Sequence, residues 1–286
     1  MARVTIGLPT YNGEDTIEQS IRSVLDQTYR DLELIVADNA STDRTVEIVR
    51  SFMATDDRVQ LLPSDENHGA AWNYNRVFDA ATGELFRWHA DDDWFEPTLI
   101  ERLVDVLDAT PDAVLAHSTT RFVDDDGATV SVYDDDLGAT GSSSRTRLTR
   151  VVRRLTYCNP VFGLIRRDVL ARTAKIGTFP ASDVTLLYEL ALCGEFAIVA
   201  EPLYVRRPGN SIKSNPTRQA IANWFGPSAT GRRFPSLQLL KASLAAIWRV
   251  EPTLGSRLTT TAAFLVVWPR ERLRRLRRRR RRANAS

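Results

Sequence analysis

The sequence predicts an α/β fold with a mostly parallel, doubly wound central sheet. Over about the first 110 residues, short apolar runs rich in branched side chains alternate with segments whose apolar residues recur at helical spacing. Of the 286 residues, 43% are hydrophobic, which is enough for one large domain or a domain with an appendage. The last 50 residues differ in character and predict a helical, basic C-terminal extension.

The first half of the chain supplies four expected strands, each followed by a helix. The apolar runs place these strands at residues 4–8, 32–37, 59–62 and 84–88. Helical patterns follow them near residues 15–25, 46–49, 72–78 and 97–107. Pro9 is expected to end the first strand. Right-handed crossovers would bring the loops after these strands to one edge of the sheet.

The pattern changes after residue 110. Short strands are expected at residues 113–118, 120–123, 129–132, 159–165, 196–199 and 203–205, and helices at 145–157 and 183–192. The acidic turns 124–126 and 134–136 are expected to be solvated, because neither follows a long buried strand and leads into an apolar helix.

Charge is distributed very unevenly along the chain. Residues 270–282 contain ten Arg and one Glu, a charge of +9, which leaves −7 for the rest because the total is +2. Residues 237–250 and 258–268 predict helices, and Trp268 beside the Arg run is typical of an interfacial membrane anchor. The alternative is that these helices pack on the domain and the Arg run is a solvated tail.

Several sequence features indicate the cellular compartment of the protein. Cys158 and Cys193 have no metal-ligand spacing and suggest buried thiols in a reducing environment. The N-terminus reaches a strand pattern at once, without the apolar region of a signal peptide, and no apolar run approaches the length of a membrane span. We therefore expect a cytoplasmic protein, peripheral on the inner face of the cell membrane.

Three adjacent carboxylates, Asp91, Asp92 and Asp93, follow the strand at 84–88. Ligands bind at the carboxyl ends of strands in open α/β sheets, and a cation would offset the repulsion among three charges. Mg²⁺ and Mn²⁺ prefer such oxygen ligands together with substrate phosphates. The alternative is a solvated acidic turn in which Asp93 caps the next helix. His89, at the end of the apolar strand, is expected to be packed or hydrogen-bonded rather than a ligand.

Several sequence blocks in order resemble the start of family-2 glycosyltransferases. They are VTIGLPTYN from Val4, SIRSVLDQTY from Ser20, ELIVADNASTDRT from Glu33, and residues 66–97, which include the acidic triplet. The resemblance covers residues 3–110 well and 150–215 more loosely. It implies a GT-A fold, the Rossmann-like fold of nucleotide-diphospho-sugar transferases. It also implies a UDP, dTDP or GDP sugar as donor, Mn²⁺ or Mg²⁺ as cofactor, and an inverting reaction.

The resemblance also implies roles for individual residues in donor binding. The residues expected to contact the donor nucleotide are Pro9, Tyr11, Asn12, Asp38, Asn67, Gly69 and Asp91. Asp38 would accept a hydrogen bond from the base or its ribose, or alternatively cap the following helix. Asp92 is expected to be the strongest metal ligand, with Asp93 as a further ligand.

The catalytic base of the family lies just before a helix in the second half, often in a Glu-Asp pair. Here the matching place reads Ser182-Asp183, so Asp183 is the expected base, with a helix N-cap as its alternative role. The stretch 204–214 lacks the His that the family often has there. The residues expected to contact the diphosphate or the acceptor are Trp94, Arg206, Arg207 and Lys213. The alternative for Trp94 is packing in the core.

The sequence therefore predicts three parts. Residues 1–110 form a nucleotide-sugar-binding half, 111–232 an acceptor-binding and catalytic-base half of the same domain, and 233–286 a helical extension with the Arg-rich tail. The expected activity is metal-dependent hexosyl or deoxyhexosyl transfer to a sugar or lipid-linked acceptor, in cell-surface polysaccharide or glycolipid synthesis. An anionic membrane surface is the expected partner of the tail, and no specific nucleic acid is expected.

Three other functions compete with this interpretation. A sugar-nucleotide nucleotidyltransferase usually opens with a Gly-rich loop and a basic residue, whereas the first loop here is residues 9–12, PTYN. A non-catalytic nucleic-acid-binding protein would use the Arg tail, but the acidic body does not favour it. A glycosidase would use paired carboxylates, and the nucleotide-type loops argue against it.

Overall fold

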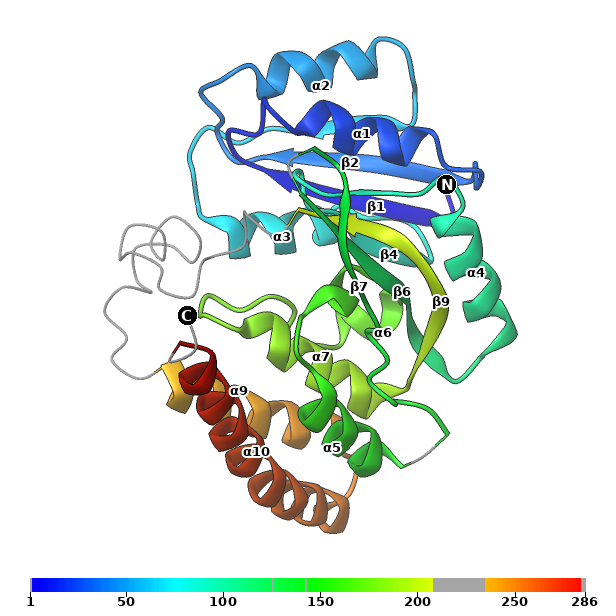
Figure 1. The fold of residues 1–286 in the computed structure, drawn as a ribbon. Helices are drawn as coiled ribbons and strands as arrows, with labels where there is room; N and C mark the ends of the chain where they lie inside the picture. The colour runs from blue at the N-terminus through cyan, green and yellow to red at the C-terminus, as the bar shows by residue number, and fades with distance from the viewer. Residues whose placement is uncertain (1, 125, 142, 208–234, 284–286) are drawn as a thin grey trace.

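The computed structural model describes residues 2–124, 126–141, 143–207 and 235–283. A single mixed sheet forms its centre, with strand order β3-β2-β1-β4-β8-β6-β9-β5 and β7 paired to β6 (Figure 1). Helices cover both faces of this sheet. The described helices α1, α2 and α4 pack on one face, and α3, α5, α6, α7, α9 and α10 lie on the other.

The first half of the chain forms the predicted parallel sheet. The parallel strands are β1 (Val4–Thr10), β2 (Leu32–Asp38), β3 (Val59–Leu62) and β4 (Leu85–Trp88). The helices that follow them are α1 (Ile17–Leu25), α2 (Thr45–Met53), α3 (Ala70–Asp79) and α4 (Leu99–Ala109). The predicted alternation is therefore confirmed in order and type.

Pro9 does not end the first strand, contrary to our expectation. β1 continues beside β2 through Thr10, with Pro9 opposite Ala37. The Gly7 carbonyl faces β4 and accepts a hydrogen bond from the His89 amide, and alternate residues face the same side. The backbone nitrogen of Pro9 therefore faces the space beyond the end of β4. No described strand lies there to accept a hydrogen bond, so the lack of an N–H in proline costs the sheet nothing.

The second half contains two long strands where four short ones were expected. β6 (Ala113–Val123) and β9 (Glu195–Arg206) are each continuous and pair in parallel. Their register shifts between Ser118 and Thr120, where residues 200–203 of β9, which include Glu201, have no partner in β6. This irregularity interrupts the apolar pattern without ending either strand.

The remaining strands are short. β5 (Trp94–Phe95) pairs antiparallel with β9, β7 (Thr129–Tyr133) forms a hairpin with β6, and β8 (Leu164–Arg166) is inserted antiparallel between β4 and β6. The strand expected at 159–165 begins instead as a 3₁₀ helix, Asn159–Phe162. Pro160 at its start suits a helical turn, because its fixed φ angle is compatible with helix and it lacks a donor.

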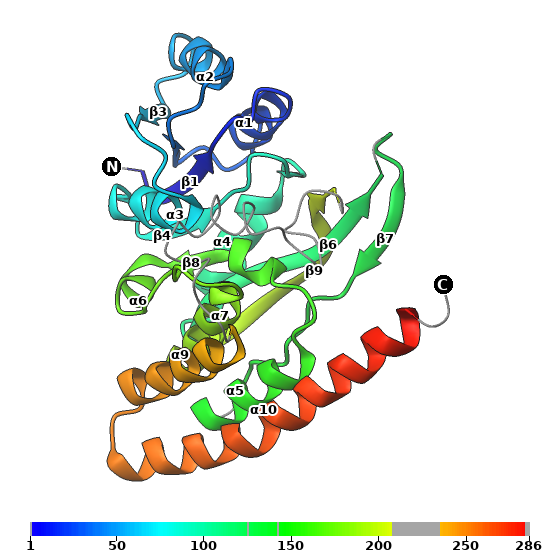
Figure 2. The ribbon, with the colours of Figure 1, turned by 90° about the vertical axis from the view of Figure 1, so that its left-hand side faces the viewer.

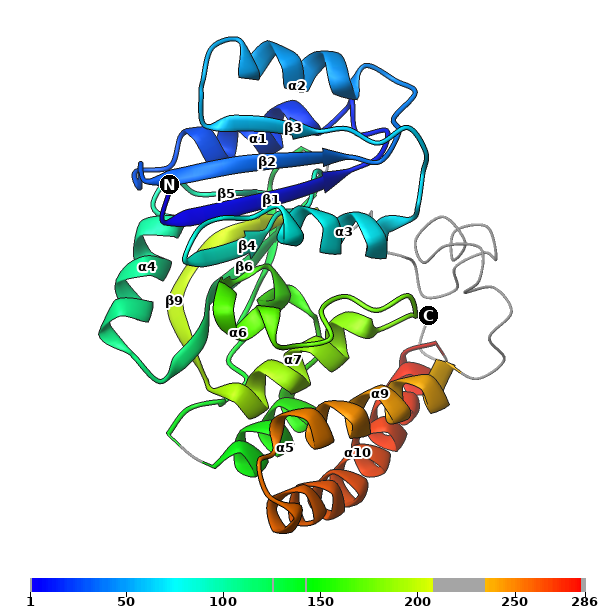
Figure 3. The same ribbon diagram turned by 180° about the vertical axis from the view of Figure 1, so that it is seen from behind.

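The remaining described helices pack below the sheet (Figure 3). They are α5 (Ser144–Arg154), α6 (Arg167–Ala171), α7 (Ser182–Cys193), α9 (Pro235–Val250) and α10 (Leu254–Ala283). α10 continues through Pro269 and through the Arg run, which is therefore helical as far as Ala283 and not an irregular tail. Among the described residues, no helix is long and apolar enough to cross a bilayer.

Candidate active site

The loops that carry the predicted site residues gather at the carboxyl edge of the sheet. β1 and β2 point the same way, and their ends lie beside the start of α3 (Figure 3). The loop after β4 is tied to that after β1, because the Thr10 hydroxyl donates a 2.6 Å hydrogen bond to the Asp91 carboxylate. The topology thus brings these three loops together, as the sequence predicted.

The loops after β1 and β2 hold each other through side chains. The buried Asp38 carboxylate accepts the Ser41 amide at 3.1 Å. The Ser41 hydroxyl accepts the Asn12 amide, and the Asn12 side-chain oxygen accepts the Thr42 amide at 2.8 Å. Asn12 adopts the left-handed region at φ 53°, which Asn tolerates. Asp38 caps this turn and not α2, whose N-cap is Arg44.

The loop between β3 and α3 is tied to the loop after β2. The Asn67 side-chain oxygen accepts hydrogen bonds from the Asn39 side chain and the Gly69 amide, both at 2.9 Å. Gly69 has φ 87° and ψ 160°, a backbone region that is open essentially to glycine alone. Tyr11 remains 43% exposed beside these loops, and Pro9 lies in β1. An exposed aromatic ring above fixed polar loops is suited to stacking on a base.

The acidic triplet divides into two kinds of carboxylate. Asp91 and Asp92 are partly exposed, and burial raises the pKa of Asp91 to about 6. Asp93 is only 1% exposed and accepts hydrogen bonds from the Tyr204 hydroxyl and from Arg206 Nε, the latter at 3.1 Å. Burial raises the pKa of Asp93 to about 7 although the Arg206 charge opposes this shift. Asp93 does not cap α4 either, since Thr98 is the N-cap.

Arg206 extends this ion pair into the second half of the chain. Arg206 Nη1 donates to the Asn159 side-chain oxygen at 2.7 Å, and the Asn159 side-chain nitrogen donates to the Asp135 carboxylate at 3.2 Å. Asp135 also accepts the Thr120 hydroxyl at 2.6 Å. Asp135 is therefore buried, and our expectation of a solvated turn at 134–136 is wrong at its central residue. We call Asp93, Arg206, Asn159, Asp135 and Thr120 the buried polar chain.

Two buried basic residues, Arg87 and His89, lie next to this chain, and only His89 was assigned a role from the sequence. The Arg87 guanidinium lies 4.6 Å from the Phe95 ring centre and 5.1 Å from that of Tyr204, and burial lowers its pKa to about 10. His89 Nε2 lies 2.8 Å from the Ser20 hydroxyl. Burial, assisted by the Arg87 charge, lowers the pKa of His89 well below its usual value. His89 is thus a packed, hydrogen-bonded residue, as expected.

Asp183 occupies the first turn of α7 and is partly buried. Its Oδ1 accepts the Val184 amide at 2.9 Å, and burial raises its pKa. The positive charge of Arg206 opposes that shift, which places Asp183 within electrostatic reach of the buried polar chain. Asp183 is not the N-cap of α7, because that position is Ala181 in the left-handed region at φ 65°.

The residues expected to contact the diphosphate or the acceptor take different positions. The Arg207 guanidinium lies 4.7 Å from the Trp94 ring centre and donates to the Gln19 side chain. Trp94 is partly exposed, so its ring is not simply core. Arg206 is committed to the buried polar chain, as described above. Lys213 lies outside the described residues.

The carboxylate oxygens at this edge of the sheet are suitable ligands for Mg²⁺ or Mn²⁺. No cluster of three or more His, Cys, Asp or Glu that could hold a metal occurs within the described part of the chain. These cations need fewer protein ligands, since they usually bind one or two carboxylates plus substrate phosphates. Asp91 and Asp92 supply two such groups. A Cβ at Gly13 would lie 2.8 Å from Asp91 Oδ2, so the first loop passes closely over this carboxylate.

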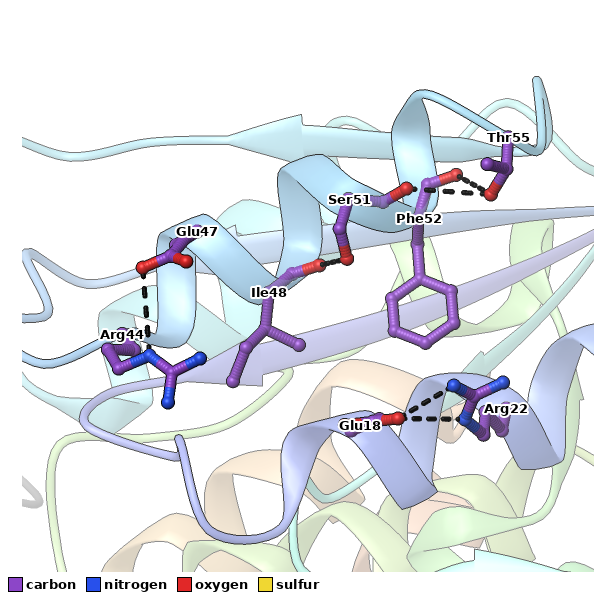
Figure 4. A pocket seen from close by; sticks show the side chains of 8 residues that line it. All are labelled: Glu18, Arg22, Arg44, Glu47, Ile48, Ser51, Phe52 and Thr55. Atoms are coloured by element: carbon purple, nitrogen blue, oxygen red, sulfur yellow. Dashed lines mark hydrogen bonds and ion pairs between the residues drawn. The ribbon is translucent and has the colours of Figure 1, made fainter.

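A pocket of about 380 Å³ lies elsewhere, between α1 and α2 (Figure 4). Its charged side chains are paired, Glu18 with Arg22 and Arg44 with Glu47. None of the predicted site residues lines it. We therefore place the candidate active site at the sheet edge and not in this pocket.

A mostly parallel sheet with acidic and polar loops at its carboxyl edge is the arrangement in which open α/β proteins bind their ligands. The family model for glycosyl transferase family 2 matches residues 5–173, more than half of the chain, and the chain belongs to that family. This confirms the resemblance found in the sequence.

Individual proteins agree with this membership. A GalNAc(5)-diNAcBac-PP-undecaprenol beta-1,3-glucosyltransferase of Campylobacter jejuni is 34% identical over 94 residues, 32% of this chain and 30% of that protein. The chain covers half or less of the length of the first curated relatives that it matches.

Solved structures share the fold. TarS of S. aureus, in complex with UDP, has a TM-score of 0.67 at 15% identity, covering 92% of this chain and 70% of that one. The mannosyltransferase PcManGT from Pyrobaculum calidifontis, in complex with GDP-Man and Mn²⁺, has a TM-score of 0.56 at 19% identity, covering 95% and 82%. The predicted GT-A fold is confirmed.

Proposed function

We propose that this protein transfers a sugar from a nucleotide-diphosphate sugar to an acceptor hydroxyl, with inversion at the anomeric carbon. The observation that carries the proposal is the meeting of the loops after β1, β2 and β4 at one sheet edge, with Asp38, Asp91 and Asp92 in them. Residues 1–110 bind the donor, 111–232 supply the acceptor side and the base, and 233–286 form the extension.

The donor nucleotide lies across the framework of tied loops. Tyr11 stacks on the base, Asp38 accepts from the base or ribose, and Asn67 with Gly69 shapes the wall of the site. Asn12 contributes mainly by holding the loops after β1 and β2 together, because its side chain and amide are both used between them. The structures of TarS with UDP and of PcManGT with GDP-Man support a nucleotide-sugar donor for a protein of this fold, and the donor proposed here is a UDP, dTDP or GDP sugar.

Asp92 and Asp91 would hold Mn²⁺ or Mg²⁺ at this edge. When bound, such an ion would supply positive charge to offset the charge that develops on the leaving diphosphate. We do not extend the ligand role to Asp93, because its Oδ2 is occupied by Tyr204 and Arg206 and the residue is buried. Arg206 likewise holds Asp93 and Asn159, so Arg207 and Trp94 are the contacts proposed for the diphosphate or acceptor.

Asp183 acts as the base. It removes the proton from the acceptor hydroxyl, whose oxygen bonds to the anomeric carbon as the bond from that carbon to the diphosphate oxygen breaks. Burial raises the pKa of Asp183, which increases its affinity for that proton. A single base with displacement from the opposite face inverts the configuration.

A sugar or lipid-linked acceptor in cell-surface polysaccharide or glycolipid synthesis fits this function best. The Campylobacter jejuni relative is named for a substrate linked to undecaprenol, which supports an acceptor at a membrane surface. The protein would then work on the inner face of the cell membrane, in contact with anionic lipid.

The first test is calorimetric titration with UDP, GDP and dTDP, each with and without Mn²⁺. We expect metal-dependent binding of one nucleotide, lost in Asp92→Ala and retained in Glu47→Ala, an exposed carboxylate on α2. Binding of none of the three, or equal binding by Asp92→Ala, would overturn the proposed donor site.

A further inference from the structure

The outward face of α10 carries a stripe of exposed apolar side chains. The residues of this outer stripe are Leu254, Leu258, Leu265, Val266 and Leu273, each 45–62% exposed. Spacings of four and seven residues place Leu254, Leu258 and Leu265 on one side of the helix, and Val266 and Leu273 widen the stripe. Single exposed apolar residues are ordinary, but a row along three turns or more is not.

The opposite face of α10 is already used by the fold. Phe264 and Val267 are buried in the core beneath the sheet, and Phe264 packs against Tyr188 of α7. Trp268 stacks on Phe264 at 6.1 Å between ring centres, with the Arg272 guanidinium over it. Trp268 therefore packs on the core while it remains partly exposed, and its role at a membrane interface stays a prediction. The outer stripe has no such partner among the described residues.

Positive charge continues the stripe toward the C-terminal end of the same helix. Residues 270–282 carry +9, and Arg270, Arg274 and Arg277 are exposed. The rest of the chain carries −7, so an anionic surface attracts this end of α10 and repels the body. Exposed apolar side chains followed by clustered Arg on one helix are the composition of a helix that lies in a membrane interface.

We infer that the outer stripe of α10 lies in the surface of an anionic lipid bilayer, its Leu and Val side chains among the acyl chains and its Arg side chains on lipid phosphates. Figure 2 shows α10 at the outer edge of the molecule, with the other elements on one side of it. This inference names the surface that makes the membrane contact of the proposed function. The biological role of the contact rests on the proposed function, whereas the contact itself does not.

This placement also orients the candidate active site. The basic end of α10 and the carboxyl ends of β1 and β2 lie on the same side of the molecule (Figures 1 and 3). A bilayer in contact with α10 would therefore hold the candidate site in a fixed orientation, at the other end of the molecule from the membrane surface.

The test is cosedimentation of the full chain with vesicles of phosphatidylcholine, alone or with one-third phosphatidylglycerol. We expect binding to the anionic vesicles only, weakened by high salt, and reduced at least about tenfold in Leu258→Glu/Leu265→Glu. The matched control is Val130→Glu/Val132→Glu, which changes two equally exposed branched residues on β7 and should bind as the parent does. Thermal unfolding of both variants checks that each is folded.

Several outcomes would overturn the inference. These are no binding to anionic vesicles, equal binding to neutral ones, or unchanged binding by the stripe variant. If the stripe variant separates a dimer in sedimentation velocity while vesicle binding stays the same, the stripe is covered by a second copy. Nucleotide titration of the same variants keeps the two proposals apart, because loss of vesicle binding should leave donor binding intact.

Discussion

At the scale of single residues, Asp183 gives the most direct test of mechanism. Burial raises its pKa, and a base must be deprotonated to accept a proton. Transfer should therefore fall as the pH drops through this raised pKa, and the fall should begin at a higher pH than for an ordinary Asp. Asp183→Asn should lower kcat by about a hundredfold to ten-thousandfold and abolish this acid limb. The measurement is release of nucleoside diphosphate in the presence of acceptor across a pH series.

Donor binding supplies the control for Asp183. Asparagine has nearly the same shape and can still accept the Val184 amide, so nucleotide titration and thermal unfolding should change little. Full transfer by Asp183→Asn would remove the residue from the mechanism. A lost activity together with lost nucleotide binding would instead mean that the substitution disturbs the donor half.

The sequence predicted the positions of some residues of the candidate site and not those of others. Asp38, Asp91 and Asp92 were predictable because each follows a strand in an alternating pattern, and topology alone then brings their loops together. The contact of Asp93 with Tyr204 joins residues 111 positions apart, and that with Arg206 spans 113. No local pattern encodes such a pair. The prediction for Asp135 was wrong because, in the sequence, a turn with a buried Asp looks the same as a turn whose three Asp are all solvated.

At the scale of elements, β6 and β9 show where the pattern of apolar residues misleads. Each was expected as two short strands, because the polar residues 118–120 of β6 and Glu201 of β9 interrupt the apolar runs. Thr120 is buried and bonds to Asp135, whereas Glu201 is exposed and pairs with Arg102 of α4. A partner on a neighbouring element thus permits a polar residue within a long strand, and that partner cannot be read from the strand itself.

The ion pair between β9 and the loop before β5 should contribute strongly to stability. Arg206→Met leaves the Asp93 carboxylate buried without its cation, and breaking a buried pair costs about 3–5 kcal/mol. Urea denaturation should show this loss, and adding Asp93→Asn should recover part of it. The matched control is Arg102→Met, which breaks an exposed ion pair between α4 and Glu201 of β9. Its loss should cost under about 1 kcal/mol. Additive effects of Arg206→Met and Asp93→Asn would contradict a coupled pair.

At the scale of the whole molecule, the C-terminal helices are part of the domain's core. Ile247 of α9 and Phe264 of α10 are buried with α5 and α7, and Arg249 of α9 pairs with the buried Glu189 of α7. The basic helical extension was predicted, and packing of its helices on the domain was the alternative to a membrane anchor that the sequence left open. Composition favoured Trp268 as an exposed anchor, whereas packing on Phe264 turns it toward the core.

Adjacent residues of α10 allow this integration to be measured. Phe264 is fully buried, and Phe264→Ala should lower the free energy of unfolding by about 3–5 kcal/mol, because it leaves a cavity against α7. Leu265 is the next residue but lies in the outer stripe, so Leu265→Ala should change stability by less than about 0.5 kcal/mol. Chemical denaturation of both variants, followed by tryptophan fluorescence, gives the comparison. If Phe264→Ala were as stable as Leu265→Ala, α9 and α10 would be a separate appendage rather than one wall of the domain. The membrane contact of α10 would then no longer fix the orientation of the active site.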